Sequence, residues 1–188
     1  MAISQPKLTL HQFLELPEAE PALELHDGVV TRKMSPKGPR GKLQWWLARW
    51  FEELTHPSGL ASAFTEARVS FAGDSFVPDV IVYLTDRVPL DEHGDIADDF
   101  YEPPDVAVEI WSPGQTLADV VARCRWYVEH GVRAALLVHP RSRWIRVFRP
   151  GLETEPLHSS ERIDLGDVLP GFTLAVDELF SPLRGRSS

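Results

Sequence analysis

Two short aliphatic segments that each begin with Pro-Asp constrain this chain more than any other feature. They are residues 77–82 and 104–110, with the sequences VPDVIV and PDVAVEI. Because side chains alternate along a strand, Asp105, Ala107 and Glu109 share one face, and the aliphatic residues between them share the other. A glutamate in an otherwise apolar strand costs free energy unless a cation, a donor or water meets it. The segments therefore predict two strands that carry carboxylates.

The carboxylates of these strands have a chemical interpretation and a structural one. If the strands are neighbours, Asp79 and Glu109 meet at one sheet edge, where they repel each other unless a hard cation such as Mg²⁺ lies between them. Metal-assisted phosphodiester hydrolysis uses this arrangement, since the ion activates water and neutralises the scissile phosphate. Pro-Asp is also a common turn ahead of a strand. The second Pro-Asp, followed by Glu109, leaves both interpretations open.

The composition is that of an ordinary globular protein. At 188 residues the chain is long enough for one well-buried core, and it has 43% hydrophobic and 25% charged residues. No apolar run approaches the ~20 residues that span a bilayer, and the polar start lacks a signal peptide's apolar stretch, so we expect cytoplasmic residence. The single Cys124 excludes an intrachain disulfide framework and a cysteine-rich zinc site.

The distribution of charge along the sequence is more informative about binding partners than the net charge. A net charge of -9 argues at first against nucleic acid as a partner. Residues 86–105, however, hold eight acids against Arg87 alone, which predicts a solvated loop between the two motif strands. Residues 31–51 hold six basic residues and no acid, and residues 121–150 hold seven arginines against Glu129 alone. A phosphate-binding face or dispersed surface arginines would each explain these basic segments.

The first part of the chain, residues 1–58, is predicted to hold a helix, a hairpin and a second helix. Thr9 is a candidate cap of the first helix, and Asp27-Gly28 supplies the hairpin turn. Apolar residues recur at helical spacing between Leu43 and Leu54. Trp45, Trp46 and Trp50 belong to this pattern, and we expect core packing for them rather than base stacking or dimer contacts.

The catalytic core is expected over residues 60–150. Extended segments are predicted at 60–71 (one strand or a bent pair), 76–84, 104–110, 134–139 and 144–149, with a helix at 115–130 ended by Gly131. Residues 169–180 should form a closing strand or short helix, and residues 181–188 a flexible tail. The whole predicts a single α/β domain with a central sheet and helices on both faces.

Several ordered blocks of the chain resemble a large family of putative restriction endonucleases within the PD-(D/E)XK nuclease superfamily. The blocks are residues 23–30, 34–36, 64–71, 77–80, 104–113, 125–132 and 169–172. Together they cover almost the whole chain. The resemblance implies a restriction-endonuclease-like α/β core with a central mixed sheet, Mg²⁺-dependent cleavage of DNA with Mn²⁺ as a possible substitute, and a homodimer.

The resemblance also implies roles for individual residues. Asp79 and Glu109 would bind the metal, Glu66 would be a supporting acid, and the backbone carbonyl of Ile110 a further ligand. In superfamily enzymes a lysine two residues past the second acid stabilises the phosphate, but Trp111 stands there in this chain. In this family the lysine has moved to the following helix, at the position of Arg123.

Arg123 is the point where the chain departs from the family pattern. Arginine stays protonated and cannot act as a general base, although its fork of donors can stabilise phosphate charge. No lysine follows Lys42, so a catalytic lysine must come from the amino-terminal part or be missing. Arg40, Lys42 and Arg125 are further candidates for contact with nucleic acid.

Two other functions remain open at this stage. A catalytically impaired DNA-binding or regulatory module could keep the scaffold after losing the lysine, and it would bind DNA in a salt-sensitive manner with little dependence on metal. Alternatively, Asp79 and Glu109 could be the acid and base of a carbohydrate hydrolase, with Trp111 and Trp126 lining the substrate site, although a core position is expected for these two rings.

Overall fold

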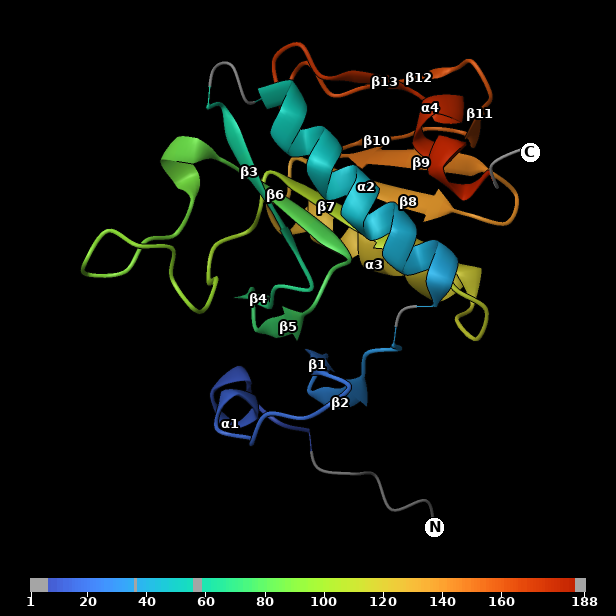
Figure 1. Cartoon of the computed structure of the whole chain (residues 1–188). Helices are drawn as coiled ribbons and strands as arrows, with labels where there is room; N and C mark the ends of the chain where they lie inside the picture. Colours follow the sequence, from blue (N-terminus) through green and yellow to red (C-terminus); the bar gives the residue numbers. More distant parts are fainter. Residues whose placement is uncertain (1–6, 36, 56–58, 185–188) are drawn as a thin grey trace.

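A computed structural model describes residues 7–35, 37–55 and 59–184, and its larger sheet has helices on both faces (Figure 1). Seven strands form this sheet in the order β10-β9-β8-β7-β6-β3, with β11 paired to β9. They are β3 (Ala61–Thr65), β6 (Val80–Leu84), β7 (Val106–Ile110), β8 (Ala134–His139), β9 (Trp144–Arg149), β10 (Leu152–Glu153) and β11 (Leu157–His158). The β7–β8 pair is parallel and the other pairings are antiparallel, which confirms the predicted mixed α/β sheet.

Two apolar layers hold the helices against this sheet. On one face lie α2 (Gly38–Thr55) and the C-terminal elements, which are β12 (Arg162–Asp164), β13 (Thr173–Ala175), α4 (Val176–Phe180) and η2 (Ser181–Leu183). On the other face lies α3 (Leu117–Glu129), whose Val120, Cys124 and Tyr127 are buried. A helix on each face is the arrangement that the sequence predicted.

Strand β7 has the predicted alternation. Val106, Val108 and Ile110 belong to the layer under α2, whereas Ala107 belongs to the layer under α3. Glu109 follows the parity of Ala107, and its carboxylate meets Tyr127 of α3. Strand β7 therefore carries Glu109 on the face that α3 covers.

A second, four-stranded sheet in the order β2-β1-β5-β4 lies below the main sheet in Figure 1. Its strands are β1 (Leu23–His26), β2 (Val29–Arg32), β4 (Val69–Phe71) and β5 (Asp74–Phe76). Asp27 and Gly28 both have positive φ, 50° and 76°, as a two-residue hairpin turn requires. The pairing of Leu25 with Ser75 ties this hairpin to β5. The preceding helix, α1 (Leu10–Leu14), is capped by Thr9 as predicted.

Two predictions about the segments between residues 76 and 105 need correction. The strand expected at 76–84 is two strands, since β5 ends at Phe76 and β6 begins at Val80 in a different sheet. Pro78 lies in the break, where its missing N–H costs no ladder hydrogen bond. The acidic segment is exposed at seven of its eight acids, but Asp105 is fully buried and pairs with Arg87 and Arg133. Segment 60–71 forms β3 and β4, which confirms the bent pair, one of its two predicted forms.

The predicted tail is also partly ordered, because Ser181–Leu183 forms the 3₁₀ helix η2 and residues 185–188 lie outside the described ones. A second 3₁₀ helix, η1 (Thr85–Arg87), follows β6. Trp46 and Trp50 pack against the core as expected, but Trp45 is 51% exposed, so its predicted core position is wrong. Within the described residues, no helix is long and apolar enough to cross a membrane.

Candidate active site at the ends of strands β6 and β7

The start of β6 lies beside the end of β7, because the two strands are antiparallel neighbours. The amide of Asp79 donates to the carbonyl of Val108 at 3.0 Å, and the amide of Ile110 donates to Oδ2 of Asp79 at 2.7 Å. Asp79 is completely buried and Glu109 is 2% exposed. The structure thus brings the two predicted carboxylates to the same place, with the Ile110 peptide beside Asp79.

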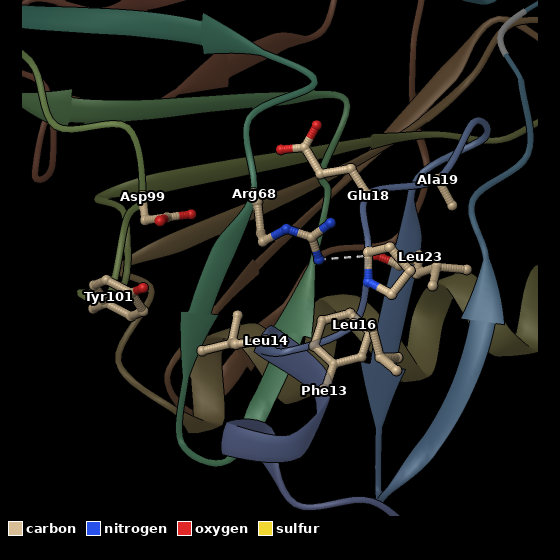
Figure 2. Close-up of a pocket in the computed structure, with 10 residues that line it drawn as sticks. Phe13, Leu14, Leu16, Glu18, Ala19, Leu23, Arg68, Asp99 and Tyr101 are labelled. Carbon is tan, nitrogen blue, oxygen red and sulfur yellow. Dashed lines mark hydrogen bonds between the residues drawn. The ribbon is translucent and has the colours of Figure 1, made fainter.

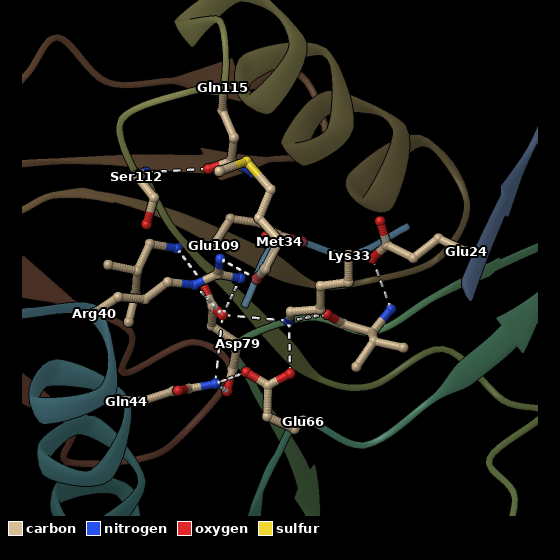
Figure 3. Close-up of polar contacts among 12 residues, drawn as sticks. Glu24, Lys33, Met34, Arg40, Gln44, Glu66, Asp79, Glu109, Ser112 and Gln115 are labelled. Carbon is tan, nitrogen blue, oxygen red and sulfur yellow. Dashed lines mark hydrogen bonds and ion pairs between the residues drawn. The ribbon is translucent and has the colours of Figure 1, made fainter. Parts of the chain in front are cut away.

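The carboxylate of Asp79 is surrounded by donors from the first turns of α2. Arg40 donates to Oδ1 through Nε at 2.8 Å and pairs with it through Nη2 at 2.6 Å. Gln44, one helical turn later on the same face, donates to the backbone carbonyl of Asp79 at 3.0 Å. Arg40 and Gln44 are buried together with the aspartate, and Figure 3 shows both pointing at it. Helix α2 therefore supplies a fixed cation to this carboxylate.

Lys33 is a site residue that the sequence did not single out. It follows β2, is 6% exposed, and places Nζ 3.3 Å from Oδ1 of Asp79 and 3.2 Å from Oε2 of Glu66 (Figure 3). Its ammonium group also donates to the carbonyl of Val77. Glu66 accepts a hydrogen bond from Gln44 with its other oxygen. The lysine required from the amino-terminal part is therefore present between two of the predicted acids. The absence of lysine after Lys42 was the signal that could have found it.

Only one carboxylate oxygen of Glu109, Oε1, has polar contacts among the described residues. Oε1 accepts a hydrogen bond from the Tyr127 hydroxyl at 2.7 Å and lies 3.5 Å from Nη1 of Arg123. Among the described residues, no hydrogen bond reaches Oε2. Burial raises the pKa of Glu109, and the nearby charge of Asp79 adds to this, while Arg123 and Lys33 oppose it. A further cation near Oε2 would relieve this cost.

Arg123 is held by another acid. Its guanidinium forms a two-pronged pair with the carboxylate of Glu24, at 3.0 Å and 2.9 Å, and lies 5.0 Å from the centre of the Phe76 ring. Glu24, on β1, is 3% exposed and also accepts a hydrogen bond from the Val77 amide. Burial disfavours the charge of Arg123, but Glu109, Tyr127 and Glu24 outweigh it and raise the pKa of the guanidinium. Arg123 is therefore a permanent cation with a fixed orientation next to Glu109.

The donor set fits a hard divalent cation in type and charge. Four carboxylates, from Glu24, Glu66, Asp79 and Glu109, face three cations, from Lys33, Arg40 and Arg123. All their ligand atoms are oxygens, which Mg²⁺ prefers, and Oε2 of Glu109 accepts no hydrogen bond from the described residues. Asp79, by contrast, already shares Oδ1 with Lys33 and Arg40, so these cations compete with a metal for it.

A different set of residues forms the most compact group of possible metal ligands in the described parts of the chain. His26, Asp27 and Asp74 place one ligand atom each within 4.8 Å of one another. Nδ1 of His26 lies 2.8 Å from Oδ2 of Asp74, and the amide of Asp27 donates to Oδ1 at 2.9 Å. These contacts join the β1–β2 turn to β5, so the group has a structural explanation.

The three residues predicted to contact nucleic acid lie in different parts of the structure. Of the three candidates for nucleic-acid contact, Arg40 lies in the carboxylate cluster. Lys42 lies on the exposed side of α2, with Nζ 4.7 Å from the centre of the Trp45 ring. Arg125 lies on α3 and pairs with Glu153 at 2.9 Å. The sequence alone did not distinguish the buried Arg40 from the exposed Lys42 and Arg125.

Several cavities open around the fold. One of about 380 Å³ is lined by Glu24, Lys33, Arg40 and Arg123, so it borders the carboxylate cluster on the side of its cations. The cavity in Figure 2, of about 190 Å³, lies between α1 and β4, where Arg68 donates to the carbonyl of Leu23. Of the four carboxylates, only Glu24 lines the first cavity and none lines the second. The first, which three cations of the cluster also line, is therefore the candidate substrate entrance.

Comparisons with known proteins agree with this architecture. The family model described as "Uma2: Putative restriction endonuclease" matches residues 10–177. The crystal structure of a putative nuclease belonging to DUF820 from Anabaena variabilis is 32% identical, with a TM-score of 0.89, and the match covers 94% of this chain and 99% of that one.

A weaker match joins 75% of this chain to 13% of a chain in a DrdV–DNA complex solved by electron cryomicroscopy. Its identity of 13% and TM-score of 0.34 are too low to inform fold or function. No curated protein matches the chain. The family model covers nearly all of the chain, and the related crystal structure has the same fold throughout. The chain therefore belongs to the Uma2 family of putative restriction endonucleases, the family that its sequence blocks resemble.

Proposed function

We propose that this protein is a Mg²⁺-dependent endonuclease that hydrolyses DNA phosphodiester bonds, with Mn²⁺ as a possible substitute. The observation that carries the proposal is the meeting of two buried carboxylates, Asp79 and Glu109, at adjacent strand ends with three cations around them. Membership of a nuclease family supports the same chemistry. Asp79 and Glu109 would hold the metal, with Glu66 and the carbonyl of Ile110 as further ligands.

The metal, when bound, would lower the pKa of a water molecule and neutralise charge on the phosphate. The remaining work falls to side chains of this chain. Tyr127 orients Glu109 by donating to Oε1, and so leaves Oε2 available to the metal. Lys33 and Arg123 both line the entrance cavity and can stabilise negative charge that develops on the phosphate oxygens.

Lys33 and Arg123 divide the task that one lysine performs in the superfamily pattern. Arg123 is tied to Glu24 by two hydrogen bonds, so its position changes little when substrate enters. Lys33 has a single flexible stem and three donors, and it can turn from Asp79 toward a phosphate. We therefore propose Lys33 as the group that contacts the scissile phosphate and Arg123 as the group that positions Glu109.

Cleavage of supercoiled plasmid with and without Mg²⁺ or Mn²⁺ tests the proposal. Asp79→Asn and Glu109→Gln should each lower the rate by at least about a hundredfold, because each removes a charged ligand. Glu155→Gln changes an exposed acid outside both the cluster and the 86–105 loop and serves as the matched control. Activity that survives in both site variants, or that is equal in EDTA, would contradict the metal mechanism.

The division between Lys33 and Arg123 has its own test. Lys33→Met should reduce cleavage by about a hundredfold or more, since it removes a donor to the transition-state charge. Lys33→Arg should recover part of the activity because it keeps the cation. Calorimetric titration with Mn²⁺ separates the two roles, since Lys33→Met should bind the ion at least as tightly as the wild type. A loss of Mn²⁺ binding in Lys33→Met would assign Lys33 a structural role instead.

A catalytically impaired DNA-binding module is the second candidate, and one observation favours it. Oδ1 of Asp79 is already shared by Arg40, Gln44 and Lys33, which reduces its capacity to hold a metal. This function predicts salt-sensitive DNA binding that Mg²⁺ and the Glu109→Gln change leave unaltered. DNA binding without cleavage at any divalent ion tested would select it over the nuclease.

The family resemblance leads us to extend the proposal to a homodimer. Sedimentation equilibrium of the full chain tests this, with twice the mass of one chain as the expected result and the mass of a single chain at micromolar concentration as the opposing one.

A further inference from the structure

A basic cavity lies next to the carboxylate cluster, at the carboxyl ends of β7 and β8. It has a volume of about 440 Å³, within the range of small-molecule sites, and its lining includes Lys37, Arg40, Arg141 and Arg143. Its lining contains no acid, although the chain as a whole carries a net charge of -9. Arg40 also contacts Asp79, so this cavity and the entrance cavity share a wall. The positive lining of this cavity would suit an anionic ligand that extends into it from the carboxylate cluster.

The outer cations of this cavity are free to bind such a ligand. Lys37, Arg141 and Arg143 are exposed, and none of them has an ion-pair partner among the residues that the structure describes. Arg125 and Arg146, on the same basic segment, are instead paired with Glu153. The second basic segment of the sequence therefore divides into paired arginines and two unpaired ones at this cavity.

Trp111, which lines the cavity, belongs to a stack of three aromatic rings. The ring of Trp111 lies on that of His139 with centroids 4.4 Å apart and planes 9° apart, and His139 lies on Trp144 at 4.8 Å and 24°. Nε1 of Trp111 donates to the carbonyl of Gln115 at 3.2 Å. The amide of Ser142 donates to Nδ1 of His139 at 3.1 Å. The three rings are therefore stacked and fixed, with Trp111 at the cavity.

We propose that this cavity binds an unpaired segment of a DNA strand, with one base stacked on Trp111 and flanking phosphates on Arg141, Arg143 and Lys37. Aromatic side chains in a basic groove are the usual means of holding single strands, because every base offers a face for stacking. In a duplex those faces are covered by the neighbouring bases. The inference rests on the proposed function in one respect, since DNA is taken as the nucleic acid that the adjacent carboxylates act on.

Fluorescence anisotropy with a labelled twelve-nucleotide oligo(dT) and a duplex of equal length tests the proposal in EDTA. The Glu109→Gln variant serves as the parent, so that binding is measured apart from cleavage. We expect the single strand to bind at least about tenfold tighter than the duplex, since stacking on Trp111 is available to it alone. Trp111→Leu should lose about tenfold in affinity and Trp111→Phe should retain most of it.

Arg141→Gln/Arg143→Gln tests the phosphate contacts. This pair of changes should weaken binding of oligo(dT) and lower the slope of log affinity against log salt by about 1.4, the value for two lost contacts with a single strand. The control Lys7→Gln/Arg162→Gln removes two exposed charges that do not line the cavity, and should leave the slope unchanged.

Four results would overturn the assignment. They are tighter binding of the duplex, tighter binding of an equal oligo(U), an unchanged slope in the arginine variant, or an equal loss in the control. Binding of oligo(dT) as described, with no cleavage by the wild type in Mg²⁺, would instead reject the proposed nuclease and leave this site standing. Cleavage of plasmid by the wild type in Mg²⁺, together with any of the four results above, would reject this site and leave the proposed nuclease standing.

Discussion

The pair of Arg123 and Glu24 yields a quantitative prediction, because it joins α3 to the amino-terminal hairpin. Glu24 is 3% exposed and accepts two hydrogen bonds from Arg123 and one from the Val77 amide. Arg123→Met would leave this buried carboxylate with the amide alone. Removing one partner of a buried ion pair costs about 3–5 kcal/mol. Since the Arg123 side chain is 24% exposed, water can replace part of the lost contact, and we expect about 3 kcal/mol.

A double-mutant cycle distinguishes the pair from general damage. Glu24→Gln removes the charge but keeps an oxygen for the Val77 amide. Adding this change to Arg123→Met should therefore restore about 1–2 kcal/mol of unfolding free energy, because no unpaired charge remains buried. Arg123→Lys should fall between wild type and Arg123→Met, since it keeps the charge without the planar fork.

Urea unfolding followed by tryptophan fluorescence measures these differences, provided that the denaturant slope is the same in all variants. Two results would refute the reasoning. One is a cost below about 1 kcal/mol for Arg123→Met, and the other is strict additivity of the two single changes. If Arg123→Met stays folded, slower cleavage with weaker Mn²⁺ binding would assign Arg123 to positioning Glu109, and unchanged cleavage would leave it only the ion pair with Glu24.

Three further predictions follow from groups outside the cluster. Asp105→Ala should lower the unfolding free energy by about 3 kcal/mol, because two arginines and the Leu84 amide lose a buried partner, whereas Asp86→Ala should change it by less than about 0.5 kcal/mol. Burial raises the pKa of the Cys124 thiol well above its ordinary value, so iodoacetamide at pH 8 should label the protein after unfolding and leave the native protein unlabelled; labelling at equal rates would contradict this. Burial lowers the pKa of His139 from 6.5, so its contribution to stability is present above pH 6.5 and is lost as the pH falls through the lowered value. Urea midpoints from pH 5 to 8 should therefore fall less steeply on acidification in His139→Phe than in the wild type, and equal slopes would be the opposing result.

The local patterns of the sequence predicted most of the fold. Period-two alternation predicted the buried β7, Asp27-Gly28 predicted the hairpin turn, and Thr9 was the predicted cap of the first helix. The break at Pro78 was missed because an apolar run does not reveal which sheet each half joins. The burial of Asp105 was missed because its partners Arg87 and Arg133 come from η1 and from the segment before β8, which are distant in sequence from each other.

The position of Lys33 could not be read from local pattern for a related reason. Its ammonium group reaches Val77 and Asp79, more than forty residues away, because the β1–β2 hairpin pairs with β5 through Leu25 and Ser75. Strand β5 runs directly into the turn that holds Asp79, so the hairpin end arrives over that carboxylate. The positions of the lysines in the sequence indicate that a catalytic lysine would come from the amino-terminal part. The long-range pairing of β1 with β5 is what brings Lys33 to Asp79.

The same long-range arrangement changes the meaning of the net charge. The surplus of acids lies largely on the exposed 86–102 segment, whereas Lys33, Arg40 and Arg123 line the entrance and Lys37, Arg141 and Arg143 line its neighbour. Local potential rather than total charge governs how an anion approaches a cleft. An acidic loop on an anion-binding protein also repels strands that do not enter the cleft. Neutralising the exposed acids of this segment, for example with Asp91→Asn and Asp95→Asn, should therefore raise DNA affinity at low salt and lose its effect as salt is added. If the variant and the wild type bind DNA with equal affinity at every salt concentration, the segment does not influence binding.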